Sequence, residues 1–176
     1  ENPKRVIFTE GEEEDMIRAA AIFLNNGMGK PILIGREEII KEKMSEIGLD
    51  FYSQMEIQST RNKEAHDRYA DHIYNRLQRK GFLKKDCLHL LTRERNVFAA
   101  CMVSLGEADS MVCGLTRSYA ASLESIEYVL DPIPNKTILG MTVMLCNGRT
   151  IFVADSNVHD MPNASQLANI TQESAE

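Results

Sequence analysis

The residues best suited to chemistry lie in one short segment, Asp109–Tyr119. An apolar run that predicts a buried β-strand ends there at Gly114. Thr116, Arg117 and Ser118 follow at the predicted start of a helix. In an open α/β sheet, ligands bind beyond the carboxyl ends of the strands, where free amides and the helix dipole attract anions. The two hydroxyl groups and the guanidinium add donors that suit a phosphate.

A purely structural reading of the same residues is equally open. In that reading Ser118 caps the helix and the Arg117 side chain extends into solvent. The spacing alone does not decide between the two, because the segment has no glycine-rich phosphate-binding fingerprint.

Two further cations, Arg93 and Arg95, precede another predicted helix. They could hold an anion near the edge of the sheet, or they could pair with Glu94 and water, which is the usual state of surface charges. We assign no catalytic residue and no metal ligand. The predicted coenzyme-binding set is Gly114, Thr116, Arg117, Ser118, Arg93 and Arg95.

A polar turn near the end of the chain is a weaker candidate. Asp155, His159 and Asp160 follow a predicted strand and could form a metal site or an acid–base set. A turn that leads to a helix cap at Asn163 explains them as well, and we favour that reading.

The turn after the first predicted strand is a poor phosphate site. Glu10 and the acidic run Glu12–Asp15 surround its amides with carboxylates, and no GxGxxG motif is present. The acidic run suits the first turn of a helix, where negative charge stabilises the helix dipole. A nucleotide-binding Rossmann half is therefore disfavoured.

The four cysteines form no CxxC motif. Cys101, Cys113 and Cys146 lie in apolar stretches, so we expect them to behave as small buried hydrophobic residues. Unpaired cysteines are typical of a reducing cytoplasm.

The elements that position these residues alternate between strand and helix. Residues 61–80 predict a helix whose inner face is Ala65, Tyr69, Ile73 and Leu77. The alternation predicts an α/β fold with an open, mostly parallel sheet and helices on both faces. The predicted strands are 5–9, 31–35, 55–58 and 109–114, and the predicted helices lie within 12–27, 36–47, 61–80, 83–91, 96–105 and 118–130.

Two prolines within Asp131–Asn135 mark the best domain boundary. We predict a first α/β subdomain at 1–131 and the start of a second, incomplete one at 132–176. The second opens with a hairpin of Ile138–Leu145 and Thr150–Ala154, joined through an Asn-Gly pair. A capping pair, Asn163 with Gln166, then begins a last helix that reaches the chain end without a stop signal.

Composition narrows the classes of protein. The chain has 176 residues, 26 acidic and 20 basic side chains, and 43% hydrophobic residues. These values exclude general disorder, and the net charge of −6 argues against general nucleic-acid binding. No apolar run approaches the ~18 residues of a membrane span, and we expect no signal peptide, so the expected location is the cytoplasm.

Several segments together resemble the phosphate acetyl/butyryltransferase family. Leu105–Gly114 matches that family's "LGDADxMVxG" strand, and Arg5–Glu12 and Lys30–Gly35 look like its first two strands. Arg149–Asp155 and the helix Asn163–Ser174 continue the match.

The chain is most similar to the phosphotransacetylase-like C-terminal domain of large bacterial NADP-dependent malic enzymes. Cys113–Tyr119, Val153–Asp155 and Val158–Pro162 carry this closer resemblance. Where transacetylases have "SGAxHTTxxTxRP", the family's histidine falls on Arg117 and its arginine on Glu124. A carboxylate in place of a phosphate-facing cation repels phosphate, so we expect the domain not to be catalytic itself.

The resemblance implies two α/β subdomains with an acyl-CoA and phosphate site between them, in a homodimer or larger homo-oligomer. It implies an acetyl-CoA-sensing domain that regulates oxidative decarboxylation of malate to pyruvate. NADP and a divalent metal ion would then bind only in an N-terminal domain. Two alternatives remain open: an active phosphate acetyltransferase, and a dimerisation module built on Ile138–Ala154.

Overall fold

The computed structural model describes residues 3–49, 55–134 and 136–175. The chain forms two compact units, Glu1–Leu130 and Asp131–Glu176. The division falls one residue before the boundary that the two prolines predict.

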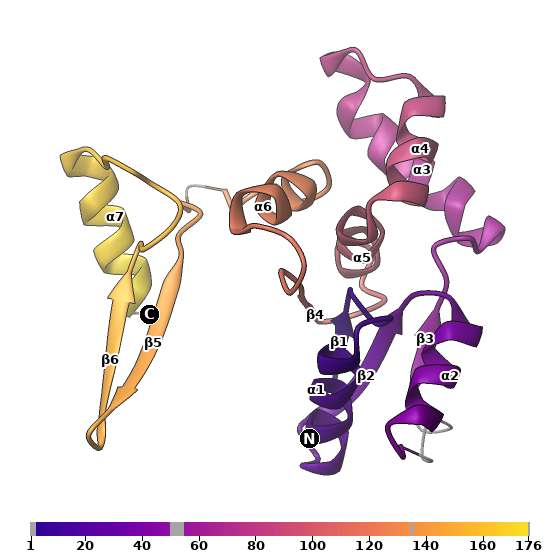
Figure 1. Cartoon of the computed structure of the whole chain (residues 1–176). Helices are drawn as coiled ribbons and strands as arrows, with labels where there is room; N and C mark the ends of the chain where they lie inside the picture. The colour runs from indigo at the N-terminus through magenta and orange to yellow at the C-terminus, as the bar shows by residue number, and fades with distance from the viewer. Residues whose placement is uncertain (1–2, 50–54, 135, 176) are drawn as a thin grey trace. The chain divides into compact units, whose positions relative to one another are not determined.

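The first unit is an α/β structure with a four-stranded parallel sheet (Figure 1). The strands lie in the order β3-β2-β1-β4, and each neighbouring pair is parallel. Their carboxyl ends therefore lie along one edge of the sheet, which is where the candidate site forms. The strands are β1 (Lys4–Phe8), β2 (Gly29–Ile34), β3 (Glu56–Gln58) and β4 (Ser110–Val112). The helices are α1 (Glu14–Asn25), α2 (Glu37–Glu46), α3 (Lys63–Leu77), α4 (Lys84–Arg93), α5 (Arg95–Ser104) and α6 (Tyr119–Glu127), with a 3-10 turn η2 (Gln78–Lys80).

Helices cover both faces of the sheet because successive strand residues point to opposite sides. In β1, Val6 and Phe8 pack with buried residues of α1 and α2. Ile7, between them, packs with residues of α3, α4 and α5. Figure 1 shows α3, α4 and α5 gathered apart from α1 and α2. The prediction of a parallel α/β sheet is confirmed.

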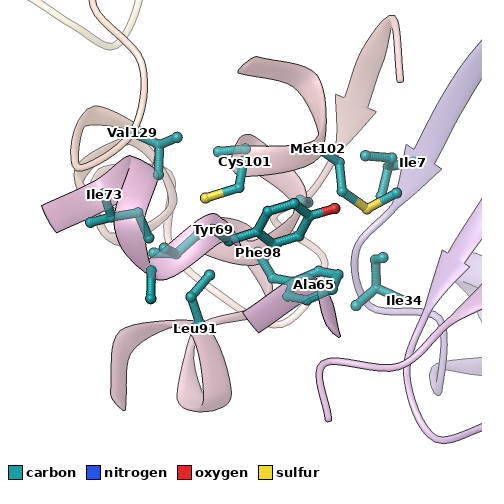
Figure 2. Close-up of a cluster of buried hydrophobic side chains, with 14 of the residues drawn as sticks. Ile7, Ile34, Ala65, Tyr69, Ile73, Leu91, Phe98, Cys101, Met102 and Val129 are labelled. Carbon is teal, nitrogen blue, oxygen red and sulfur yellow. The ribbon is translucent and has the colours of Figure 1, made fainter. Parts of the chain in front are cut away.

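The larger hydrophobic cluster is organised by α3 and α5 (Figure 2). The predicted inner face of α3 is confirmed, since Ala65, Tyr69, Ile73 and Leu77 are all buried. The Tyr69 ring meets Phe98 of α5 edge to face at a centroid distance of 5.1 Å. This packing fixes the beginning of α5, which carries part of the candidate site.

Two burial predictions were wrong. Strand β4 is not a buried strand, because it lies at the edge of the sheet and leaves Val112 42% exposed. Cys146 is exposed at the end of a two-stranded ribbon rather than buried as a small hydrophobic residue.

The second unit contains the predicted hairpin and a final helix. Its strands β5 (Met141–Cys146) and β6 (Arg149–Ala154) pair antiparallel. Asn147 and Gly148 have φ values of 48° and 73°, as a two-residue type I′ turn requires. The capping pair is also confirmed: the Gln166 amide donates to Asn163 Oδ1 and the Asn163 amide to Gln166 Oε1, each at 2.9 Å. Helix α7 (Ala164–Ala175) follows.

Within the described ranges, no helix has both the length and the apolar character needed to cross a membrane.

Candidate functional site

The loops that leave β1 and β2 are held together at the carboxyl edge of the sheet. The Gly11 amide donates to the Ile34 carbonyl at 3.1 Å, and the Gly35 amide donates to the Gln58 carbonyl at 3.0 Å. A Cβ at Gly11 would lie 2.9 Å from the Ile34 oxygen. The backbones of the two loops are therefore in close contact. The side chains of the residues that follow these strands lie at the carboxyl edge of the sheet.

The loop after β4 wraps around a carboxylate of this chain. The amides of Gly114 and Leu115 donate to Glu10 Oε2 at 3.1 and 2.9 Å. The amide and the hydroxyl group of Thr116 both donate to Glu10 Oε1 at 2.7 Å. One of the two readings left open by the sequence had free amides here for a phosphate. In the structure an internal anion from the loop after β1 takes these donors.

Glu10 is 6% exposed and is held in its charged form. Burial alone would raise the pKa of its carboxyl group. The hydrogen bonds from the Thr116 hydroxyl and from the three loop amides outweigh burial and lower the pKa below its ordinary value. We name Glu10 with the loop Gly114–Thr116 the carboxylate-filled loop.

The two residues after this loop have structural partners. The Ser118 hydroxyl caps α6 by accepting a hydrogen bond from the Ala121 amide at 3.4 Å. The Arg117 guanidinium pairs with Glu94, the residue between α4 and α5. The structural reading of Ser118 as a helix cap therefore holds, while Arg117 is paired rather than free in solvent.

Four of the six predicted coenzyme-binding residues nevertheless line one cavity. This cavity, the Thr116 pocket, has a volume of about 230 Å³. Gly114 and Ser118 do not line it, and Gly114 contributes only its amide to Glu10. The lining residues are Glu10, Arg93, Arg95, Asn96, Thr116 and Arg117.

Asn96 is a lining residue that the sequence did not single out. It is 4% exposed, and its side-chain amide makes no hydrogen bond within the described part of the chain. Ser122 Oγ is the one fully buried side-chain polar atom without a partner among the described residues, so the polar atoms of Asn96 remain accessible at the cavity wall and can donate to or accept from a ligand. Its place in the first turn of α5 gave no signal, since asparagine at a helix start usually serves as a cap.

Glu12 joins two arginines beside this pocket. Its Oε1 accepts from the Arg36 amide at 2.9 Å and from Arg36 Nε at 3.0 Å. Its Oε2 lies 2.9 Å from a terminal nitrogen of Arg36 and 2.9 Å from one of Arg95. The Arg36 side chain, opposed by burial and helped by Arg95, lowers the pKa of Glu12 to about 2.

Only part of the acidic run Glu12–Asp15 lies in the first turn of the helix, where the sequence predicted all of it. Glu14 and Asp15 do lie in the first turn of α1, as expected. Glu12 instead precedes the helix and faces the arginines, with a side chain only 9% exposed.

A second cavity, the arginine pocket, shares Arg93 and Arg95 with the Thr116 pocket. Its volume is about 260 Å³. The sequence missed Arg36 and Arg61, although each directly follows a predicted strand or its turn and could have been found by that position. The lining residues are Glu12, Gly35, Arg36, Thr60, Arg61, Thr92, Arg93 and Arg95.

A third and more apolar groove also reaches Arg93. Its volume is about 530 Å³, and Phe82 and Leu90 are among its lining residues. Arg93 thus borders all three cavities, and its guanidinium has no hydrogen-bond or ion-pair partner in the described ranges.

The polar turn after β6 is organised by Asp155. Its carboxylate accepts from the amides of Gly140, Val158 and His159 at 3.0 to 3.1 Å, and it pairs with the His159 ring. These contacts support the reading as a structural turn. Among the described residues, no group of three or more His, Cys, Asp or Glu side chains is placed to hold a metal ion.

Comparisons with known proteins agree on one family. A model of the phosphate acetyl/butaryl transferase family matches residues 1–176. The NADP-dependent malic enzyme of Rhizobium meliloti (strain 1021) is 44% identical over 174 residues, which are 98% of this chain and 23% of that protein. The probable NADP-dependent malic enzyme of Rickettsia prowazekii (strain Madrid E) is 40% identical over the same shares. The chain therefore spans about a quarter of these relatives.

The fold is similar to that of a solved transferase. The EutD phosphotransacetylase from Staphylococcus aureus superposes with a TM-score of 0.87 at 22% sequence identity. The match covers 98% of this chain and 52% of that one. The resemblance inferred from the sequence motifs is confirmed.

Proposed function

We propose that this chain, which belongs to the phosphate acetyl/butaryl transferase family, is an acyl-CoA-binding regulatory domain of a bacterial NADP-dependent malic enzyme. The remainder of the polypeptide would oxidatively decarboxylate malate to pyruvate. NADP and the divalent metal ion would bind there, and this domain would bind acetyl-CoA as an effector. The identity of 44% to a malic enzyme of which the chain covers 23% supports this division of labour.

The observation that carries the proposal is the position of Arg93. It borders two cationic pockets and one more apolar groove, and its guanidinium has no partner in the described part of the chain. Acyl-CoA has a phosphorylated nucleotide at one end and a long, weakly polar arm at the other. A free guanidinium at the junction of cationic and apolar cavities suits the phosphates of such a molecule.

The carboxylate-filled loop supports binding through arginines rather than through backbone amides. Because Glu10 already accepts from three amides and a hydroxyl group, a phosphate at this loop would have to displace it. The phosphates are therefore assigned to Arg93 and Arg95, with Asn96 as an additional polar contact. Thr116 and Arg117 shape the wall of the same pocket.

Calorimetric titration of the chain with acetyl-CoA tests the proposal. Arg93→Gln should weaken binding about tenfold or more, because a hydrogen bond between charged groups contributes about 1.5–3 kcal/mol. Arg79→Gln is the matched control, since Arg79 is an exposed arginine outside these cavities. Absence of acetyl-CoA binding, or equal affinities for both variants, would contradict the assignment.

The regulatory part needs a separate measurement. In the complete polypeptide, acetyl-CoA should change the rate of malate-dependent NADP reduction, and Arg93→Gln should remove that response while leaving the basal rate unchanged. A rate of malate-dependent NADP reduction that is the same with and without acetyl-CoA would refute regulation but not binding.

The second candidate is an active phosphate acetyltransferase, which the family match and the likeness to a phosphotransacetylase favour. In that reaction the thiolate of CoA attacks acetyl phosphate, and the protein mainly positions the reactants and neutralises charge. An assay for acetyl-phosphate formation separates the candidates: turnover by the complete domain supports the transferase, and binding without turnover supports regulation.

We also propose a cytoplasmic homo-oligomer with small-molecule acyl-CoA or phosphate as its partner. The exposed strands β5 and β6 support assembly, because large apolar side chains point from both faces of the ribbon. A lone two-stranded sheet is marginally stable in water, so a second surface that covers it would stabilise the unit.

A further inference from the structure

The lining of the arginine pocket contains more positive than negative side chains. Four guanidiniums line it, from Arg36, Arg61, Arg93 and Arg95, and Glu12 is the one carboxylate among its lining residues. The formal charge of the lining is therefore +3. Glu12 forms ion pairs with Arg36 and Arg95, so its negative charge is already paired within the cluster.

Two of the four guanidiniums, both on exposed residues, have no side-chain partner among the described residues. Neither Arg61 nor Arg93 has a side-chain hydrogen bond or ion pair in the described ranges. By contrast, Arg18, Arg68 and Arg117 each pair with a glutamate. Like charges that line one cavity repel each other, and a bound anion would relieve that repulsion.

The backbone around the pocket adds to the attraction for an anion. Helix α5 begins at Arg95 with no acidic residue in its first turn and no side-chain cap. Glu94, the residue that could cap it, pairs with Arg117 instead. The first amides of a helix lack partners within the helix, so the positive end of α5 adds to the field of the arginines.

The size of the pocket and its donors indicate the class of anion. A volume of about 260 Å³ exceeds the needs of a single small ion and suits a compact group with several oxygens. One guanidinium can donate two parallel hydrogen bonds to two oxygens of a phosphate. The Thr60 hydroxyl group at the wall of the pocket is a further donor. A free diphosphate carries roughly −3 at neutral pH, which matches the formal charge of the lining, and a diphosphate esterified at both ends carries about −2.

We propose that the arginine pocket is a binding site for a diphosphate, either free or as part of a nucleotide. Arg61 and Arg93 provide the free guanidiniums, and Glu12 holds Arg36 and Arg95 in place beside them. This inference does not depend on the proposed function, because it concerns the anion alone and is tested without acyl-CoA.

Titration with inorganic pyrophosphate, followed by calorimetry at 0.15 M salt to suppress weak surface binding, is the direct test. One equivalent should bind, and Arg61→Gln should weaken its affinity about tenfold or more. Arg79→Gln is the control, because it removes an exposed arginine of the same charge that lies outside the pocket. Circular dichroism of both variants checks that the fold is retained.

Two further titrations identify the source of the diphosphate. If saturating acetyl-CoA abolishes pyrophosphate binding, the coenzyme's own diphosphate occupies the pocket; if pyrophosphate still binds, the natural ligand is a free diphosphate or another nucleotide, and ADP distinguishes these. Absence of pyrophosphate binding, or equal affinity in the Arg61→Gln and Arg79→Gln variants, would overturn the proposal. Failure of acetyl-CoA to bind while pyrophosphate binds would refute only the proposed function.

Discussion

Glu12 gives the sharpest quantitative prediction, because its carboxylate joins three parts of the first unit. It lies in the loop after β1 and contacts Arg36 at the start of α2 and Arg95 at the start of α5. Glu12→Gln keeps the shape of the side chain and removes its charge. The variant therefore reports what the ionised carboxylate contributes to folding.

The magnitude follows from the pKa of this group. The pKa falls from an ordinary value of 4.5 to about 2 in the folded chain. A shift of one unit corresponds to about 1.4 kcal/mol, so the ionised form contributes about 3 kcal/mol to the free energy of unfolding at pH 7. The Glu12 side chain is only 9% exposed, but its main partner Arg36 is 51% exposed, so solvent screening makes about 3 kcal/mol an upper value.

The pH dependence has a definite sign. A folded-state pKa below the unfolded value gives a contribution that is complete above about pH 5 and is lost as pH falls toward 2. The difference between the parent chain and Glu12→Gln should thus be largest at neutral pH and less than half as large at pH 3.

Urea unfolding at pH 7 and pH 3, followed by circular dichroism, measures both values. Glu14→Gln is the control, since Glu14 forms an exposed pair with Arg18 that is worth about 0.3–0.5 kcal/mol. The reasoning is refuted if Glu12→Gln costs no more than the control at pH 7. A difference that does not shrink on acidification would refute the electrostatic origin.

Three further predictions concern other contacts. Thr116→Val removes the hydroxyl bond to Glu10 and should lower the free energy of unfolding by about 1–3 kcal/mol in urea titrations; an unchanged midpoint would contradict this. Arg76→Met removes donors to three carbonyls at the end of α6 and should speed amide exchange in that helix, whereas unchanged protection would exclude a capping role. Phe152→Glu places a charge on the exposed apolar ribbon and should shift the sedimentation profile toward monomer. Ser165→Glu, at an exposed position of α7, is the control and should leave the profile unchanged. Equal oligomer fractions in the two variants would refute assembly through the ribbon.

Local patterns predicted the elements well because the forces that set them act over a few residues. The 3.6-residue spacing of Ala65, Tyr69, Ile73 and Leu77 specifies a buried helix face without knowledge of its neighbours. The Asn-Gly pair at 147–148 specifies a tight turn in the same way, because both residues tolerate positive φ.

The chemistry of the site depended on contacts that no local pattern contains. Glu10 and Thr116 are 106 residues apart, and their contact exists because β1 and β4 are neighbours in the sheet. The local sequence at Gly114 indicates amides suited to an anion, but it contains no sign that the Glu10 carboxylate accepts from them. Burial of β4 was mispredicted for the same reason, since edge position depends on strand order.

The arginine pocket shows the same limit. Arg36 and Arg61 follow β2 and β3, which are neighbours in the sheet, and they line one pocket with Arg93 and Arg95 from the α4–α5 segment. Each looks like an ordinary surface arginine in the sequence. Only their convergence around Glu12 gives them a common role.

A crystal structure of the chain with acetyl-CoA would show directly whether Arg93 binds a phosphate of the coenzyme. A coenzyme phosphate should lie within hydrogen-bond distance of the Arg93 guanidinium, about 2.7–3.2 Å from its nitrogens. Glu10 should keep its hydrogen bonds to the Gly114–Thr116 loop. A coenzyme bound with Arg93 still unpartnered, or with its phosphate in place of the Glu10 carboxylate, would contradict the account.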